Sequence, residues 1–187
     1  MEAATRVGRI ISVLLGVVLC VGVLMAPVAG AAEKPFKMSY AGVGYDSTVD
    51  TNGDTLPVTY TDATAQGSFG AAEGAITAEF SLVAPAGVSC RAGYEVLLGL
   101  HQSATVLTFK DQSQLFGWSQ NGWICIDSDT GHYYGQVTGA YIGGAGRFAK
   151  ATGSFVSDFD GYNLDMPTIG GIGFRSIRGS VDGKVKF

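Results

Sequence analysis

The feature that most constrains this chain is an alternation of apolar and polar residues with a period of two. In residues 76–82 the apolar side chains fall at every second position, and the polar ones lie between them. Because successive side chains of a β-strand point to opposite faces, this alternation predicts a half-buried strand. Similar runs occupy residues 93–100, 104–109, 122–127, 132–142 and 174–187. No window of ten residues after residue 33 has the 3.6-residue period of a helix, so the sequence predicts an all-β fold.

Short segments rich in Gly, Asp, Asn and Pro separate many of these runs and predict turns. They are residues 50–54, 84–87, 119–122, 128–131, 160–161 and 182–183. Closely spaced strands with no helices between them favour an antiparallel sheet, either closed into a barrel or folded into a sandwich. The chain contains 28 glycines, and Gly139, Gly153 and Gly179 fall inside expected strands. Glycine relieves crowding where strands bend or pack closely, which favours the single closed barrel.

The N-terminal residues 1–32 have the pattern of a secretory signal peptide. Arg6 and Arg9 precede an apolar run of roughly 16 residues, and small residues follow at 26–32. The run is shorter than the ~20 residues that a membrane-spanning helix needs. We therefore expect a signal helix cleaved after Ala31 or Ala32, with an uncleaved N-terminal anchor as the alternative. The mature chain, residues 33–187, then forms one secreted or periplasmic domain without a stable membrane span.

The cysteines agree with an oxidising compartment. Cys20 lies in the signal segment, which leaves the pair Cys90 and Cys125 in the mature domain. An even pair in a secreted chain predicts a disulfide. A reactive thiol or a metal ligand is the alternative, but the sequence has neither a C-x-x-C motif nor clustered histidines to support it.

The charge of the chain bears on its partners. The chain has 12 basic and 16 acidic residues, and removal of the signal segment takes away Arg6, Arg9 and Glu2. The remaining 10 basic and 15 acidic residues give the mature chain a net charge of about −5. Nucleic acids need basic patches, so this balance argues against a nucleic-acid partner. It also argues against electrostatic attraction to anionic lipid.

The glycine-rich stretch YIGGAGRFAKATGSF, residues 141–155, could either cradle a phosphate or connect two strands. A phosphate loop needs a helix after the glycines, whereas the residues that follow here have a strand pattern. We therefore expect a hairpin with a tight glycine turn. Gly143, Gly144 and Gly146 are expected to supply positive φ angles, and Phe148 to anchor the returning strand in the core.

The pattern formed by Gly143, Gly144, Gly146, Phe148 and Gly153 resembles a hairpin of the allene oxide cyclase and dirigent protein barrels. It is also similar to secreted bacterial relatives of unassigned function. The resemblance is specific over about 15 residues and implies an antiparallel barrel of about eight strands with a central cavity. Members of this group cyclise an unsaturated fatty-acid epoxide or guide the coupling of phenoxy radicals, and they often form dimers or trimers. No catalytic residue is carried over to this chain.

Few residues suggest metal or cofactor chemistry. His101 and His132 lie in different segments and are expected to be surface or loop histidines. Asp50, Asn52 and Asp54 form the first half of a calcium-loop pattern, but its glycine is displaced and its final glutamate is missing, so a solvated turn is favoured. We expect no metal and no cofactor.

The aromatic and acidic residues of the later strands are the candidates for a ligand site. Tyr133, Tyr141, Tyr162 and Asp158 are predicted to line the mouth of a barrel pocket. Three hypotheses remain open: a barrel that binds a small apolar molecule or an extracytoplasmic partner, a cyclase or isomerase on an apolar substrate, and a structural or surface-interaction protein. An apolar cavity favours the first, converging polar groups favour the second, and a solidly packed interior leaves only the third.

Overall fold

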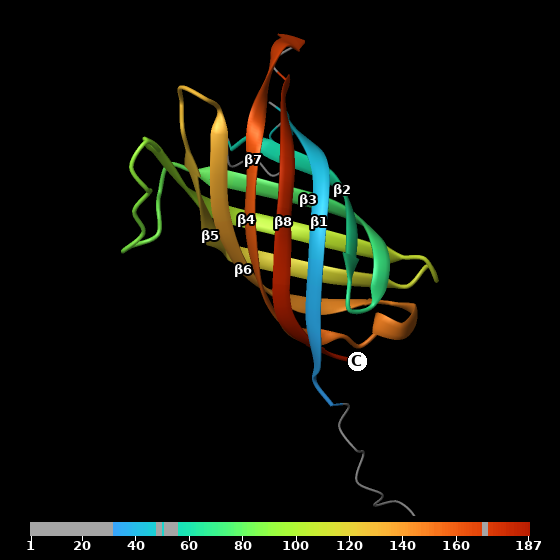
Figure 1. The fold of residues 1–187 in the computed structure, drawn as a ribbon. Helices are drawn as coiled ribbons and strands as arrows, with labels where there is room; N and C mark the ends of the chain where they lie inside the picture. Colours follow the sequence, from blue (N-terminus) through green and yellow to red (C-terminus); the bar gives the residue numbers. More distant parts are fainter. Residues whose placement is uncertain (1–31, 48–49, 51–55, 170–171) are drawn as a thin grey trace, which may run out of the picture. The chain divides into compact units, whose positions relative to one another are not determined.

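The computed structural model describes residues 32–47, 50, 56–169 and 172–187, which form a closed antiparallel barrel (Figure 1). Its strands are β1 (Lys34–Ser47), β2 (Val58–Gly67), β3 (Gly70–Ser81), β4 (Val96–Phe109), β5 (Gln114–Ile126), β6 (His132–Ala145), β7 (Thr152–Ile169) and β8 (Ile172–Lys186). Each strand pairs with the next in the sequence, and β8 pairs with β1. The predicted all-β single barrel is confirmed, and the predicted signal helix lies outside the described residues.

The up-and-down order places the connections alternately at two ends of the barrel. One end holds the short connections 68–69, 110–113 and 146–151, together with the start of β1 and the end of β8 (Figure 1). We call it the plugged end. The other end, called the loop end, holds the connections 82–95 and 127–131, together with the end of β1, the start of β2, the end of β7 and the start of β8. No helix among the described residues is long and apolar enough to cross a membrane.

The interior of the plugged end is filled by aromatic rings. Phe148 is fully buried, and its ring centroid lies 4.8 Å from that of Phe187, 5.0 Å from that of Phe109 and 5.9 Å from that of Phe69. Phe36 stacks on Phe69 at 5.7 Å. Large buried side chains lose the most apolar surface to water, so this cluster is the main hydrophobic core.

Glycines on the inner face make room for rings on neighbouring strands. Phe155 of β7 pairs in register with Gly139 of β6 on one side and with Gly183 of β8 on the other. A Cβ atom at Gly139 would lie 2.5 Å from the Phe155 ring, and one at Gly179 would lie 2.6 Å from the Tyr40 hydroxyl. The prediction that glycines relieve crowding within strands is therefore confirmed at Gly139 and Gly179.

The glycine-rich stretch connects two strands, as predicted, through a short 3-10 turn, η1 (Gly146–Phe148). Gly143 and Gly146 have φ angles of 140° and 60°, so the expected positive φ is confirmed at both. The same expectation is wrong for Gly144. A Cβ there would lie 2.0 Å from the Gln114 carbonyl oxygen, so this glycine permits close strand packing instead. Phe148 anchors the connection itself, before the returning strand begins.

Three predicted turns are wrong because the strands continue through them. Residues 119–122 lie within β5, where the register with β6 shifts between Trp118 and Asn121. Residues 160–161 and 182–183 lie within β7 and β8. A Cβ at Gly183 would lie 2.3 Å from the Ser154 carbonyl oxygen, so this glycine also serves strand packing. The turns expected at 84–87 and 128–131 do lie in connections.

A disulfide joins Cys90 to Cys125, which confirms the predicted pair. Cys125 belongs to β5 and points to the outer side of the sheet, as does Leu97, its partner in register on β4. It is nevertheless fully buried. The bond therefore attaches the 82–95 connection to the outside of the barrel near the loop end.

Candidate functional site: the cavity inside the barrel

A cavity of about 120 Å³ lies inside the barrel, and all eight strands contribute to its wall. It exists because β2 and β3 place small side chains on the inner face. Ala63 faces Gly74 in register, and Thr61 faces Ile76, whereas the opposite wall carries rings such as Phe155 and Phe159. The same period of two that fills the plugged end with rings thus leaves space where the inward residues are small.

The wall is mostly apolar but carries a few hydroxyl groups. The hydroxyls of Tyr40 and Ser157 lie 3.0 Å apart and hydrogen-bond to each other. Tyr133 donates its hydroxyl hydrogen to the Ser176 carbonyl oxygen at 2.6 Å. The hydroxyl of Tyr141 is buried and has no hydrogen-bond partner among the described residues. Of these three tyrosines, Tyr141 is the one whose hydroxyl lacks a partner in the described part of the chain.

One charged residue reaches the cavity from the loop end. Arg175 of β8 lines the wall, and its Nη2 donates a hydrogen bond to the carboxylate of Asp46 on β1. Thr59 donates a second hydrogen bond to the same carboxylate, at 2.7 Å. The Nε of Arg175 is buried without a partner among the described residues. The ion pair neutralises the guanidinium locally but leaves this N–H as a donor.

Burial controls the protonation of the wall tyrosines. Desolvation raises the pKa of Tyr141 and of Tyr133 well above the usual range for a phenol. Desolvation also raises the pKa of Tyr40, although its hydrogen bond with Ser157 acts in the opposite direction. All three therefore stay protonated at neutral pH, and each hydroxyl keeps its hydrogen-bond donor.

The four predicted ligand-binding residues separate into two pairs. Tyr133 and Tyr141 line the cavity. Asp158 and Tyr162 instead lie on the outer face, because Ser157 and Phe159 occupy the inward positions of β7. Asp158 accepts a hydrogen bond from Gln136 at 2.8 Å, and Tyr162 is 49% exposed. The structure thus does not bring the four together, and a binding role for each remains a prediction.

Sequence reasoning missed Tyr40, Ser157 and Arg175. Strict parity along residues 155–160 could have found Ser157, because it falls on the same face as the two phenylalanines at 155 and 159. The Tyr40 contact joins residues 117 positions apart, so no local pattern shows it.

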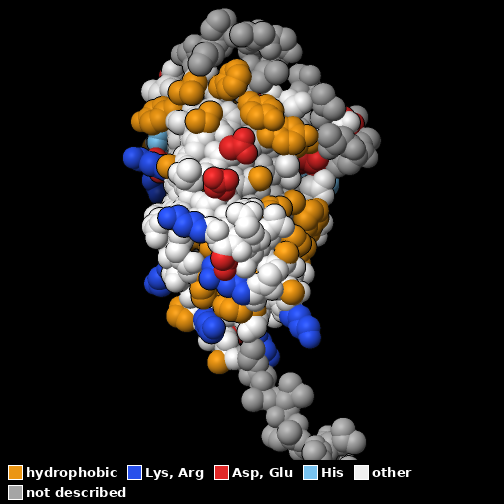
Figure 2. All heavy atoms as spheres, turned by 90° about the vertical axis from the view of Figure 1, so that its right-hand side faces the viewer, with side chains coloured by type: hydrophobic (Ala, Val, Ile, Leu, Met, Phe, Trp, Pro, Cys, Tyr) orange, Lys and Arg blue, Asp and Glu red, His pale blue; other side chains and the backbone are white. Residues whose placement is uncertain are grey.

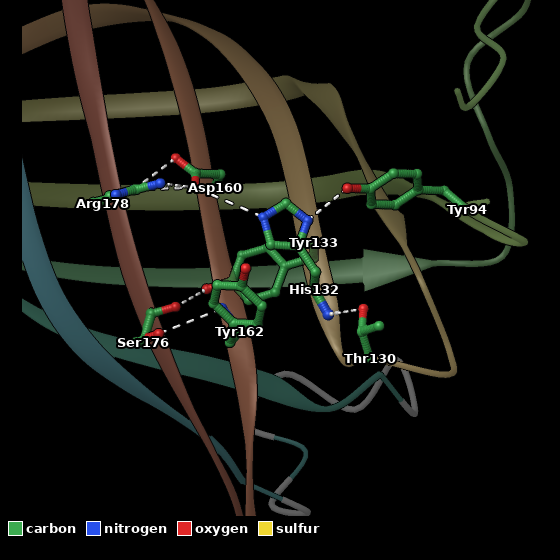
Figure 3. A network of polar contacts seen from close by, with 8 residues as sticks. All are labelled: Tyr94, Thr130, His132, Tyr133, Asp160, Tyr162, Ser176 and Arg178. Carbon is green, nitrogen blue, oxygen red and sulfur yellow. Dashed lines mark hydrogen bonds and ion pairs between the residues drawn. The ribbon is translucent and has the colours of Figure 1, made fainter. Parts of the chain in front are cut away.

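A polar network on the outer face of the barrel includes His132, which was expected to be a surface or loop histidine (Figure 3). His132 is the first residue of β6, directly follows the 127–131 connection and is half-buried on this face. Its Nδ1 lies 2.6 Å from the Tyr94 hydroxyl, and its Nε2 lies 3.7 Å from an Asp160 carboxylate oxygen. Asp160 also pairs with Arg178 at 2.9 Å. His101 lies on β4 and is exposed.

The network fastens the 82–95 connection to the barrel wall. Tyr94 packs edge-on against Tyr134 at 4.7 Å, and the backbone N–H of Arg91 donates to the Tyr134 hydroxyl at 2.8 Å. These contacts lie close to the disulfide, so the connection is held by both a covalent bond and an aromatic cluster.

The structure offers no support for a resident metal in the part of the chain it describes. No group of three His, Cys, Asp or Glu residues there is arranged to hold an ion. Of the calcium-loop pattern, Asn52 and Asp54 lie outside the described residues.

Comparisons with protein-family models, with curated proteins and with solved structures find no match to this chain.

Proposed function

We propose that this protein is an extracytoplasmic barrel that binds a small, largely apolar molecule in its interior cavity. The observation that carries the proposal is an apolar cavity whose wall includes Tyr141, a residue whose hydroxyl is buried and has no hydrogen-bond partner among the described residues. A buried polar group without a partner costs about 1–3 kcal/mol, and a ligand oxygen that accepts its hydrogen bond would remove this cost. The Cys90–Cys125 disulfide supports an extracytoplasmic location.

The cavity limits the size and chemistry of the ligand. A dry apolar cavity of about 150 Å³ in a protein core holds a benzene molecule, so about 120 Å³ suits a single ring or a short chain. The hydroxyl of Tyr141 and the Nε of Arg175 are both hydrogen-bond donors without a partner among the described residues. The favoured ligand is therefore an apolar body that carries one or two hydrogen-bond acceptors, such as carbonyl, ether or hydroxyl oxygens.

A cyclase or isomerase activity on such a molecule is the second candidate. It is favoured by the donors on the wall, because a phenol and a guanidinium can polarise a substrate oxygen such as that of an epoxide. The resemblance to the allene oxide cyclase and dirigent barrels suggests the same class. However, the raised pKa of the wall tyrosines makes them poor bases at neutral pH, so simple binding is favoured.

The test is native mass spectrometry of the protein purified from its own source, compared with a cavity-filling variant, Ala63→Leu. Ala63 is buried on the cavity wall, so its enlargement removes space where the ligand would lie. The matched control is Ala75→Leu, the same change at an exposed position of β3.

We expect a co-purifying small molecule with the natural protein and with the control, and none with Ala63→Leu. If the natural protein carries no small molecule and apolar extracts do not raise its unfolding temperature, the binding proposal is wrong. Conversion of the bound molecule into a new compound by the purified protein would instead favour the enzyme.

A further inference from the structure

The basic residues of the barrel gather at one end. Among the ten Lys and Arg residues that the structure describes, seven lie at the plugged end and all seven are exposed. These are Lys34, Lys37, Lys110, Arg147, Lys150, Lys184 and Lys186. The other three are Arg91, Arg175 and Arg178. Figure 2 shows the same separation on one face, where most blue side chains lie toward the plugged end and most red ones lie farther away.

Three carboxylates form ion pairs with these cations but do not balance them. Ion pairs join Lys37 to Asp182 at 3.1 Å, Arg147 to Asp111 at 3.5 Å and Lys184 to Glu33 at 3.8 Å. Their side chains are exposed, so each pair is weak and can exchange partners. In the described part of the chain, no carboxylate pairs with Lys110, Lys150 or Lys186.

The plugged end combines these cations with partly exposed aromatic rings. The cations come from the start of β1, the 110–113 connection, the residues around η1 and the end of β8. The ammonium of Lys34 lies 4.3 Å from the ring centroid of Phe187, and both Phe187 and Phe69 are only half-buried. Basic groups beside partly exposed aromatic rings suit a flat anionic surface better than an extended chain.

The order of segments along the chain also points to the plugged end. β1 begins at the plugged end, and the apolar run from residue 10 to 25 precedes it in the sequence. The eight residues 26–33 can span no more than about 28 Å when fully extended. The segment that would enter a membrane as a signal or an anchor is thus joined through a short connection to the strand that starts at the plugged end.

From these observations we infer that the plugged end is a docking face for an anionic phospholipid bilayer, with its lysines and Arg147 bound to lipid phosphates. The net negative charge of the chain does not oppose this contact. At physiological salt the screening length is about 8 Å, so carboxylates at the loop end act weakly on a surface that touches the plugged end. The docking face does not depend on what the interior cavity binds.

The experiment uses residues 32–187, which form one compact unit with all eight strands and the disulfide. Its binding to phosphatidylcholine vesicles, with and without phosphatidylglycerol, is measured by co-sedimentation at rising salt. The test variant is Lys150→Ala with Lys186→Ala. The control is Val43→Glu with Leu82→Glu, which makes the same change in net charge at positions 54% and 86% exposed, away from the plugged end.

We expect binding only when phosphatidylglycerol is present, and weaker binding as the salt concentration rises. Each lysine near an anionic bilayer adds roughly fivefold in affinity, so the test variant should bind about 30-fold more weakly. The control should bind like the natural sequence, and both variants should keep its unfolding temperature.

Equal binding to neutral vesicles would overturn the inference, as would an equal loss of binding in the control. Binding to soluble polyphosphate with no binding to either kind of vesicle would also overturn it, and would assign the face to a polyanion.

Discussion

The two ends of the barrel are stabilised in different ways, although the same sheet forms both. At the plugged end, rings from five phenylalanines fill the interior, and Phe148 at its centre is fully buried. At the loop end, the stabilising contacts lie outside the sheet, in the Cys90–Cys125 disulfide and the polar network of His132. The interior between these ends holds a cavity. Filling one end from within and fastening the other from outside leaves that space unfilled by side chains.

The largest expected effect comes from emptying the plugged end. Phe148→Ala should lower the free energy of unfolding by about 3–5 kcal/mol, because it removes the ring at the centre of the cluster and leaves a cavity. Phe80→Ala, which changes a half-buried ring beside the existing cavity, should cost clearly less. Urea unfolding of the oxidised proteins measures both, and equal losses would contradict the contrast between the two regions.

Removal of the disulfide tests the external fastening of the loop end. The double change Cys90→Ser and Cys125→Ser should lower the free energy of unfolding by about 2–4 kcal/mol, because the bond constrains the unfolded chain. Hydrogen exchange should become faster in residues 82–95 while amides near Phe148 keep the slowest rates. Uniformly faster exchange over the whole barrel would show that the two ends are not independent.

A matched pair of hydroxyl deletions compares two wall tyrosines. Tyr133→Phe removes the hydrogen bond to the Ser176 carbonyl and should cost about 1 kcal/mol of stability. Tyr141→Phe removes a buried hydroxyl without a partner, so it should leave the stability of the ligand-free protein unchanged or slightly higher. Thermal unfolding with and without the co-purifying ligand checks this. The Tyr141 change should also weaken ligand binding, and a clear loss of ligand-free stability would contradict the assignment.

The smallest expected effect concerns Asp160 on the outer face. Hydrogen bonds and charge from Arg178, aided by His132, lower the pKa of this carboxyl. A lowered folded-state pKa means that the stabilisation exists above the ordinary pKa of an aspartate, about 3.9, and disappears as the pH falls through the folded value. Arg178→Gln should raise the pKa of Asp160 in a carboxyl NMR titration. Lys37→Gln, which breaks an ion pair at the plugged end, should leave it unchanged.

The sequence predicts the architecture well because the alternation of side chains between the two faces of a β-strand is a local property. Alternation along each run, with glycines at positions such as Gly139, is enough to indicate a closed antiparallel sheet. Parity fails where the register shifts, as it does within β5 and between Glu79 and Phe80. The turn predicted at 119–122 was wrong for that reason.

The candidate site is harder to predict because its members meet only in the closed barrel. Arg175 and Asp46 are 129 residues apart, and neither belongs to a motif. Asp158 and Tyr162 were grouped with the pocket because they lie near aromatic residues in the sequence, but neighbouring residues of a strand face opposite sides. The net charge is likewise a sum over the whole molecule, so it does not reveal that the lysines are concentrated at one end.

The pairing of β8 with β1 has a consequence for biogenesis. Lys34 at the start of β1 lies opposite Val185 near the end of β8, so the sheet cannot close until the last strand has been delivered. In a chain that crosses a membrane from its N-terminus, one edge of β1 would stay unpaired until β8 has emerged. Exposed strand edges of this kind promote aggregation. For a secreted chain with this pairing, translocation speed and holding chaperones should therefore affect the yield more strongly than for a helical domain of equal length.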